Sequence, residues 1–221
     1  MSDKQKTIVN EVTLKGIGLH TGNSTTLTLK PAPINKGFVF VRIDLEGRPE
    51  VEADANYVTT TDRGTTLDKK GVIINTSEHV LAALVGMDLD NVYIEMDNSE
   101  PPILDGSSRF FIEAIEKAGI IEQDAVREYY DIKENVTYID PDSGSEITAI
   151  PSKNYEIATM VDFGTKVLGT QNATLKRMTD FKTEIANART FSFLHELEHL
   201  LAAGLIKGGD LNNAIIYVDK P

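Results

Sequence analysis

The chain of 221 residues contains no cysteine, no tryptophan and fewer basic than acidic side chains. Without cysteine there are no disulfides, thiolate metal sites or thiol nucleophiles, so any metal ion must be held by His, Asp or Glu. The 22 Lys and Arg against 34 Asp and Glu give a formal net charge of -12. Because a general nucleic-acid binder needs a basic face to neutralise phosphates, we expect no nucleic-acid partner.

Long apolar runs are also missing from the sequence. The longest covers residues 80–87, far short of the roughly 20 residues that span a bilayer, and the N-terminal segment Met1–Lys6 is polar. We therefore expect a cytoplasmic protein that at most touches a membrane surface. An apolar content of 41% with 25% charged residues is ordinary for a globular fold.

The most informative motif places a carboxylate beside an imidazole at the start of an expected helix. Asn75 is a suitable N-cap, Glu78 follows three positions later as in a capping box, and the apolar residues after it have helical spacing. His79 would lie in the first turn, where the helix dipole keeps an imidazole neutral and able to bind a metal. Glu78 could accept a proton from a metal-activated water, although capping alone is the plainer interpretation of this residue.

A second motif, HELEH at His195–His199, matches the HExxH pattern of zinc proteases, in which two histidines one helical turn apart bind zinc. Such a protease needs a third ligand, yet no Glu or His follows this segment, and only Asp210 and Asp219 remain. Three leucines would share one face of an expected helix over residues 193–203: Leu194, Leu197 and Leu201. This pattern is typical of a surface helix, so a zinc protease is the less favoured alternative.

Four short strings occur in order along the chain: GIGLHTG at Gly16–Gly22, TSEH at Thr76–His79, PILDGS at Pro102–Ser107 and ARTF at Ala188–Phe191. Together they resemble the zinc-dependent UDP-3-O-acyl-N-acetylglucosamine deacetylases of lipid A biosynthesis, from about Thr7 to the last residue. The resemblance implies hydrolytic removal of the N-acetyl group from UDP-3-O-acyl-N-acetylglucosamine, giving acetate and the free amine, in lipopolysaccharide synthesis.

The resemblance also implies roles for single residues. His79 would be one of three zinc ligands, Glu78 the general base, and Thr190 a hydrogen-bond donor to the oxyanion of the transition state. Five residues would bind the substrate: Leu19, His20, Phe191, Phe193 and Gly208. No GxGxxG or GxxxxGK string occurs, so nucleotide recognition would concern a UDP-acyl-glucosamine substrate and not a nucleotide cofactor.

The chain departs from the family pattern in its histidines, which are His20, His79, His195 and His199. The other two zinc ligands of the family, in an HKxxD string, and a later general-acid histidine are absent. Catalytic zinc normally takes three protein ligands, so we expect these residues beyond Pro221. A chain that ends there should be inactive by itself and should expose apolar surface that favours self-association. The alternative is a catalytically inactive domain that binds a sugar nucleotide.

The order of expected elements indicates an α+β fold. Strands precede a helix twice in the first half, with helices over residues 78–87 and 109–118, and the polar stretch Glu122–Asp124 reads as a linker. We therefore expect a first domain at 1–124, carrying Glu78 and His79, and an incomplete second domain at 125–221, carrying Thr190.

The second half should contain strands at 129–132, 146–150, 157–163 and 214–218 and helices at 181–186 and 193–203. The resemblance implies two domains of similar topology whose helices pack between two sheets. It also implies that residues around 193–203 belong to an insert that shapes a passage for the acyl chain.

Overall fold

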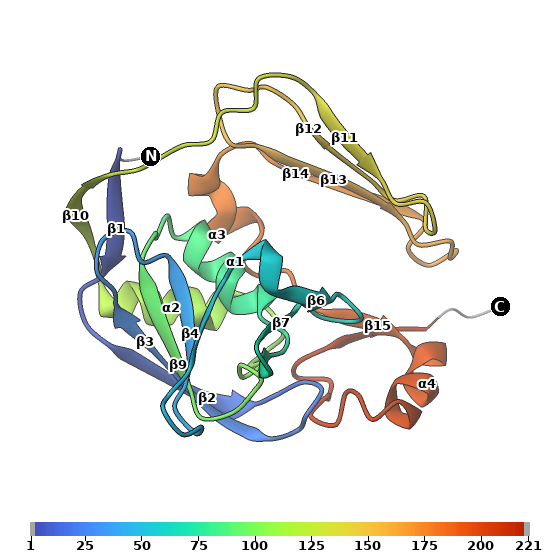
Figure 1. Cartoon of the computed structure of the whole chain (residues 1–221). Coiled ribbons are helices and arrows are strands. Elements are labelled where there is room, and N and C mark those ends of the chain that lie inside the picture. The colour runs from blue at the N-terminus through green and yellow to red at the C-terminus, as the bar shows by residue number, and fades with distance from the viewer. Residues whose placement is uncertain (1–2, 219–221) are drawn as a thin grey trace.

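A five-stranded sheet carries the main core in the computed structural model, which describes residues 3–218 (Figure 1). Its strands lie in the order β2 (Val12–Ile17), β3 (Ser24–Pro31), β9 (Val92–Met96), β4 (Phe38–Arg42) and β5 (Glu50–Glu52). β4 and β9 are parallel, whereas all the other neighbours in this sheet are antiparallel.

Helices α1 (Glu78–Gly86) and α2 (Arg109–Ala118) pack against this sheet. Alternation along β3 buries Leu27 and Leu29 fully, as expected for a strand with one face in the core. Helix α2 buries Phe111 and Ile115, which are one helical turn apart. The apolar residues of the two helices and of the sheet therefore form one continuous core cluster.

The other strands form smaller sheets. They are β1 (Lys4–Ile8) with β10 (Ile120–Val126), β6 (Val58–Thr60) with β7 (Thr66–Lys69) and β8 (Val72–Ile74), β11 (Val136–Ile139) with β12 (Glu146–Ala149), β13 (Ile157–Asp162) with β14 (Thr170–Leu175), and β15 (Phe191–Phe193) with β16 (Ile215–Tyr217). Short helices complete the chain: η1 (Ala55–Tyr57), η2 (Met178–Asp180), α3 (Phe181–Glu184), η3 (Leu194–Glu196) and α4 (Leu197–Ala202). The predicted α+β class is confirmed.

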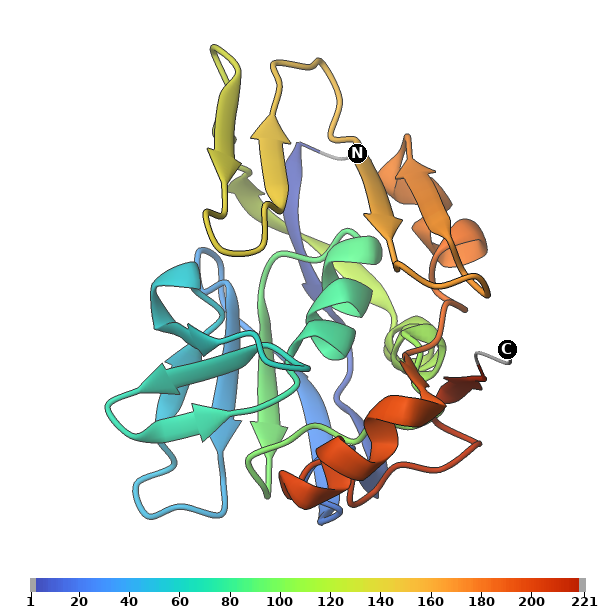
Figure 2. The ribbon, with the colours of Figure 1, turned by 90° about the vertical axis from the view of Figure 1, so that its right-hand side faces the viewer.

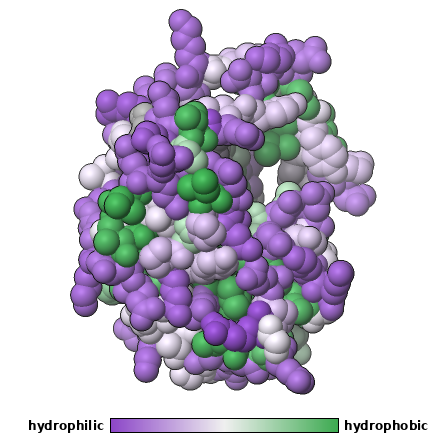
Figure 3. Space-filling model, turned by 60° about the vertical axis from the view of Figure 1, so that its left-hand side comes forward, coloured by the Kyte–Doolittle hydropathy of each residue, from purple (hydrophilic) through white to green (hydrophobic). Residues whose placement is uncertain are grey.

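The hairpins β11–β12 and β13–β14 extend away from the main sheet, whereas α4 lies at the other end of the molecule (Figure 1). Figure 2 shows the C-terminal segment with α4, in red, below α1. Apolar side chains on the face drawn in Figure 3 form separate groups within a mainly hydrophilic surface. No helix within residues 3–218 has both the length and the apolar character that crossing a membrane requires.

The helix predicted over residues 78–87 forms as α1, but its N-cap differs from the predicted one. Ser77 is its N-cap and Glu78 its first residue, so the prediction that Asn75 caps the helix with Glu78 at the third position is wrong. Thr76 has a φ of 51°, in the left-handed region, and this interrupts the helical path after Asn75. The side chain of Asn75 instead accepts a hydrogen bond of 3.2 Å from the Thr66 hydroxyl.

The polar stretch Glu122–Asp124 is part of a strand and not a linker. It lies in β10, which pairs in antiparallel fashion with β1. Gln123 donates a hydrogen bond of 2.8 Å to the carbonyl of Ala32 and accepts one of 2.8 Å from Asn91. An exposed two-stranded pair tolerates polar residues, so composition alone could not separate this strand from a linker. The strand predicted at 129–132 does not form.

The helix predicted at 193–203 is also divided. Residues 191–193 form β15, residues 194–196 form the 3₁₀ turn η3, and only Leu197–Ala202 is α-helical. A 3₁₀ turn advances about 120° a residue instead of about 100°, which shifts the leucine pattern. Leu194 and Leu201 are 50% and 58% exposed, whereas Leu200, which was not part of the predicted stripe, is buried. The predicted leucine stripe is therefore not the buried face of this segment. The helix predicted at 181–186 forms as the shorter α3, and the strand predicted at 214–218 forms as β16.

Gly86 of α1 packs closely against Phe181 of α3. A Cβ added to Gly86 would lie 2.1 Å from Cδ1 of Phe181, whose ring belongs to the core cluster. We expect Gly86→Ala to lower the free energy of unfolding by about 1–3 kcal/mol through overpacking, in spite of a helix-propensity gain of about 1 kcal/mol. Urea unfolding would measure this cost. The cost of Gly86→Ala should be smaller in a Phe181→Leu background. Equal costs in the two backgrounds would show that overpacking against Phe181 is not the cause.

Candidate active site

Glu100 is a fully buried carboxylate that joins two of the predicted motifs. One of its oxygens accepts hydrogen bonds from the backbone N–H of His20 at 3.0 Å and from the Thr76 hydroxyl at 2.9 Å. The other accepts from the backbone N–H and the hydroxyl of Thr21, at 2.8 and 2.7 Å. These four donors compensate the cost of burying the charge. A Cβ on Gly18 would lie 2.3 Å from this carboxylate, which explains a glycine in the GIGLHTG string.

Glu78 and His79 lie side by side at the start of α1, with His79 Nε2 3.9 Å from Glu78 Oε1. The other carboxylate oxygen of Glu78 accepts a hydrogen bond of 2.9 Å from the backbone N–H of Thr65. Burial lowers the pKa of His79, although the negative charges of Glu78 and Asp105 oppose this effect. The imidazole is therefore neutral at pH 7, which is the form that binds a metal.

A cavity of about 270 Å³ lies between the GIGLHTG loop and the C-terminal segment. Four of the predicted site residues line it: Leu19, His20, Thr190 and Phe191. Most of the remaining wall is apolar and comes from α4 and the residues after it: Leu197, Leu200, Leu201, Ile206, Leu211, Ala214 and Ile216. The cavity is thus an apolar chamber with a few polar groups from the two motifs.

The loop between β9 and α2 connects this cavity to α1. The Ser108 hydroxyl donates a hydrogen bond of 3.2 Å to the carbonyl of His79, and the N–H of Thr190 donates one of 2.8 Å to the carbonyl of Gly106. Gly106 has a φ of 82°, and a Cβ there would lie 2.0 Å from the carbonyl oxygen of Asn213. The close approach of the two segments therefore requires glycine at this position.

Two of the predicted substrate residues, Phe193 and Gly208, do not line the cavity. Phe193 is 7% exposed, and its ring stacks on that of His195 with centroids 5.5 Å apart and meets Phe191 edge to face. Gly208 is buried, and its N–H donates a hydrogen bond of 3.0 Å to the carbonyl of Leu19. Both residues support neighbours that do line the cavity.

The surroundings of the HELEH segment argue against a zinc protease. Glu196 accepts two hydrogen bonds from Arg63, at 2.7 and 3.2 Å, and one from the backbone N–H of Phe193. The Arg63 contact, which has the largest effect, lowers the pKa of Glu196 to about 2, so this carboxylate is a poor base. His195 packs on Phe193, and His199 is exposed.

Asp210, one of the two acidic candidates for a third ligand, does not complete a metal site at this segment. Asp210 lies in the cavity wall and accepts backbone hydrogen bonds from Asn212 and Asn213, at 2.7 and 3.1 Å. Asp219 lies outside the described residues. Within residues 3–218 no three His, Asp or Glu side chains gather closely enough to hold a metal ion.

Sequence reasoning missed both Glu100 and Arg63. The available signal for Glu100 was its place two residues before the PILDGS string, directly before Pro101. Arg63 carried no local signal, because its partner Glu196 is 133 residues away in the chain.

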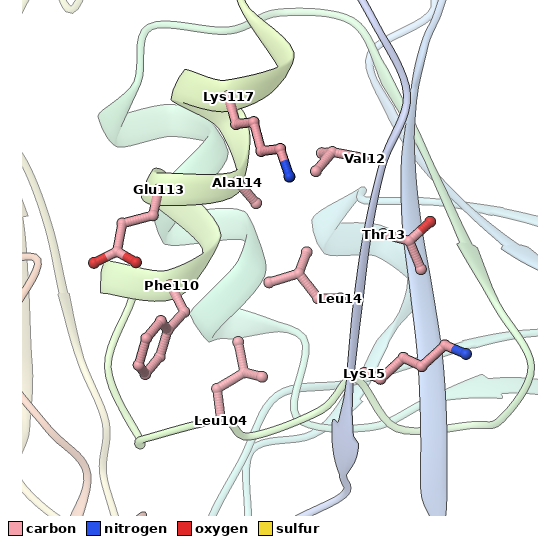
Figure 4. A pocket seen from close by; sticks show the side chains of 9 residues that line it. All are labelled: Val12, Thr13, Leu14, Lys15, Leu104, Phe110, Glu113, Ala114 and Lys117. Carbon is pink, nitrogen blue, oxygen red and sulfur yellow. The ribbon is translucent and has the colours of Figure 1, made fainter.

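A second hollow lies apart from these residues. It is an open groove of about 400 Å³ between β2 and α2 (Figure 4). Its lining residues are Val12, Thr13, Leu14, Lys15, Leu104, Phe110, Glu113, Ala114 and Lys117. None of the predicted site residues is among them, so the cavity beside His20 and Thr190 is the candidate active site.

The model of the UDP-3-O-acyl N-acetylglycosamine deacetylase family, LpxC, matches residues 5–221 of the chain. Over 217 residues the chain is 46% identical to the bifunctional enzyme LpxC/FabZ of Bacteroides thetaiotaomicron, covering 98% of this chain and 47% of that protein. It is 45% identical to the protein of the same name from Chlorobaculum tepidum, with 98% and 46% covered. It is 40% identical to the UDP-3-O-acyl-N-acetylglucosamine deacetylase of Chromohalobacter salexigens, with 98% and 72% covered.

The chain therefore belongs to the LpxC deacetylase family, and the resemblance of the four strings is confirmed. It spans about half the length of the bifunctional relatives.

The Arg63–Glu196 pair should make stability depend on pH. Because the pKa of Glu196 falls from 4.5 to about 2 on folding, its contribution is present above pH 4.5 and is lost as the pH falls toward 2. Arg63 is 46% exposed, and solvent screening limits the gain. We expect Glu196→Gln to lower the free energy of unfolding at pH 7 by ~1 kcal/mol, and the difference to shrink between pH 4.5 and 2. Urea unfolding at several pH values measures it.

Glu198→Gln is the matched control, since Glu198 lies in the same segment and is exposed. Glu198→Gln should change the free energy of unfolding little, both at pH 7 and between pH 4.5 and 2. An effect of Glu196→Gln that stays the same from pH 7 to pH 2 would contradict the role of the ion pair.

Proposed function

We propose that this chain is part of an enzyme that removes the N-acetyl group from UDP-3-O-acyl-N-acetylglucosamine, releasing acetate and leaving a free amine, in lipid A biosynthesis. The observation that carries the proposal is that Glu78 and His79 lie side by side and that His79 is close enough to His20 for the two charges to interact, while His20 and Thr190 line an apolar cavity. Glu78 and His79 themselves are not among the residues that line this cavity. The family of the chain agrees with this activity. We place the reaction in the cytoplasm, with at most peripheral contact with a membrane.

The cavity suits the acyl chain of such a substrate. Its walls from α4 and residues 206–216 are mainly leucine, isoleucine and alanine, which remove a hydrocarbon chain from water without leaving polar groups unpaired. Leu19 and Phe191 extend this surface toward the polar motifs. Phe193 and Gly208 would act on the substrate indirectly, by supporting Phe191 and Leu19.

His79 is suited to be one zinc ligand, because burial keeps its imidazole neutral. A site with three protein ligands would need further donors from outside the described residues, since residues 3–218 offer no group of three. Zinc, when bound, would lower the pKa of the attacking water and polarise the acetamide carbonyl.

Glu78 would accept the proton of the attacking water. The N–H of Thr65 holds one carboxylate oxygen of Glu78, and this orients the other oxygen toward His79. Thr190 would donate its hydroxyl to the oxyanion as charge develops on the acetamide oxygen. Its backbone is fixed on both sides, by Gly106 at 2.8 Å and by Ile215 at 3.0 Å, so the hydroxyl has a stable support.

Glu78 and His79 should respond differently to substitution in the full-length gene product. Glu78→Ala should lower kcat by about 10²–10⁴-fold and leave bound zinc in place, because it removes a base and not a ligand. His79→Ala should lower the zinc content. Metal analysis of the purified proteins and acetate release from the acylated sugar nucleotide would measure both effects. Equal zinc loss in the two variants would contradict the separate roles, and an inactive unmodified protein that binds the sugar nucleotide would favour a binding domain.

The histidines of the HELEH segment should be dispensable for this reaction. Changing both His195 and His199 to Gln should leave zinc content and deacetylation nearly unchanged, because both side chains are exposed and outside the cavity. Loss of one equivalent of zinc in this double variant, or casein cleavage by the unmodified protein, would favour a protease.

A further inference from the structure

We propose that Glu100 is a positioning residue for the reaction. Its buried carboxylate holds Thr76 in a left-handed backbone conformation. This conformation sets the direction of the chain as it enters α1, and so the orientation of Glu78 and His79. The inference rests on the proposed roles of Glu78 and His79, and it adds a residue that touches neither of them.

The backbone of Thr76 is the feature that needs an explanation. A β-branched residue at a φ of 51° is a genuine outlier, which persists only where the surroundings hold it. Thr76 is 4% exposed, and its hydroxyl donates to Glu100 at 2.9 Å. The neighbouring N–H groups of Asn75 and Ser77 donate to Ser99 at 2.7 Å and to Thr65 at 3.2 Å. The Thr76 side chain is thus held by a charged acceptor, and the backbone on either side by carbonyls.

This turn decides where Glu78 points, because the helix starts two residues after Thr76. If Thr76 relaxed to a negative φ, the chain would leave in another direction and the contact of Glu78 with the Thr65 N–H, now 2.9 Å, would lengthen. Proton transfer is sensitive to such displacements, and a misplacement of about 1 Å can cost about 100-fold in rate.

The same carboxylate also anchors a second segment of the site. Backbone N–H groups of His20 and Thr21 donate to it, so the loop that brings Leu19 and His20 to the cavity shares one anchor with the turn before α1. Four donors converge on two oxygens. A glutamine at position 100 has one acceptor oxygen and would turn an NH₂ group toward a donor, so the arrangement calls for a carboxylate.

Two substitutions at Thr76 test the proposal with little change in volume. Thr76→Val removes the hydroxyl and keeps the branched shape, whereas Thr76→Ser keeps the hydroxyl. In the full-length gene product we expect Thr76→Val to lower kcat about 10- to 100-fold with KM changed less than about 3-fold. Thr76→Ser should stay close to the unmodified protein. Glu100→Gln should resemble Thr76→Val. If Glu100→Gln does not fold, the comparison of Thr76→Val with Thr76→Ser tests the proposal by itself.

A second readout does not need activity. In the 221-residue chain, the amide proton of Thr65 reports the contact with Glu78, through its NMR chemical shift and its hydrogen exchange. Thr76→Val should shift this resonance and speed its exchange, whereas Thr76→Ser should do neither.

The possible results separate this inference from the proposed function. An unmodified full-length protein without deacetylase activity would overturn the proposed function, and the Thr65 amide would still report the positioning. An unchanged Thr65 amide in Thr76→Val would overturn the inference, whatever happens to the rate. A shifted amide with unchanged kcat, or a change in KM alone, would also overturn it.

Discussion

The loop between β9 and α2 is where the first half of the chain meets its last quarter, and the candidate site depends on it. At its start Glu100 accepts hydrogen bonds from the GIGLHTG loop and from the turn before α1. Farther along, Gly106 accepts from Thr190 at 2.8 Å and Ser108 donates to Ala186 at 3.1 Å. These bonds use main-chain groups, the Thr76 hydroxyl and one buried carboxylate, so displacing the loop would leave polar groups unpaired at about 1–3 kcal/mol each.

Half of the eight left-handed non-glycine residues that the structure describes lie in this loop or in segments that contact the candidate site. Four non-glycine residues there have left-handed backbones, with φ of 50–59°: Arg63, Thr76, Leu104 and Ile206. Such a conformation costs on the order of 1–3 kcal/mol and persists where neighbouring contacts over-determine it. Arg63 and Ile206 line the cavity, and Thr76 precedes Glu78 and His79. The fold thus offsets local strain with hydrogen bonds at the place where side chains must point in fixed directions.

Much of the fold could be predicted because its signals are local. Apolar residues alternate along β3 and β9, as expected of strands with one buried face, and the helical spacing after Glu78 predicted α1. The errors arose where a distant contact overrode a local rule. Asn75 is a good capping residue, but the contact of Thr76 with Glu100 keeps the residue after Asn75 out of the helix. Residues 191–193 pair with β16 instead of starting a helix, so the spacing of the leucines after Phe193 no longer matches one helix face. The substrate and metal roles, and the division into domains at 124 and 125, stay predictions.

The chain contains three pairs of adjacent glutamate and histidine, and the surroundings of two of them, Glu78–His79 and His195–Glu196, give them different chemistry. Glu196 is bound by the guanidinium of Arg63, which keeps it ionised and weakly basic, and His195 stacks on Phe193. At the other pair, burial keeps His79 neutral. Among the residues that the structure describes, no guanidinium holds Glu78, and its one hydrogen-bond donor is the backbone N–H of Thr65. A short motif names the groups available for catalysis. The residues packed around it decide which of them can bind a metal or move a proton.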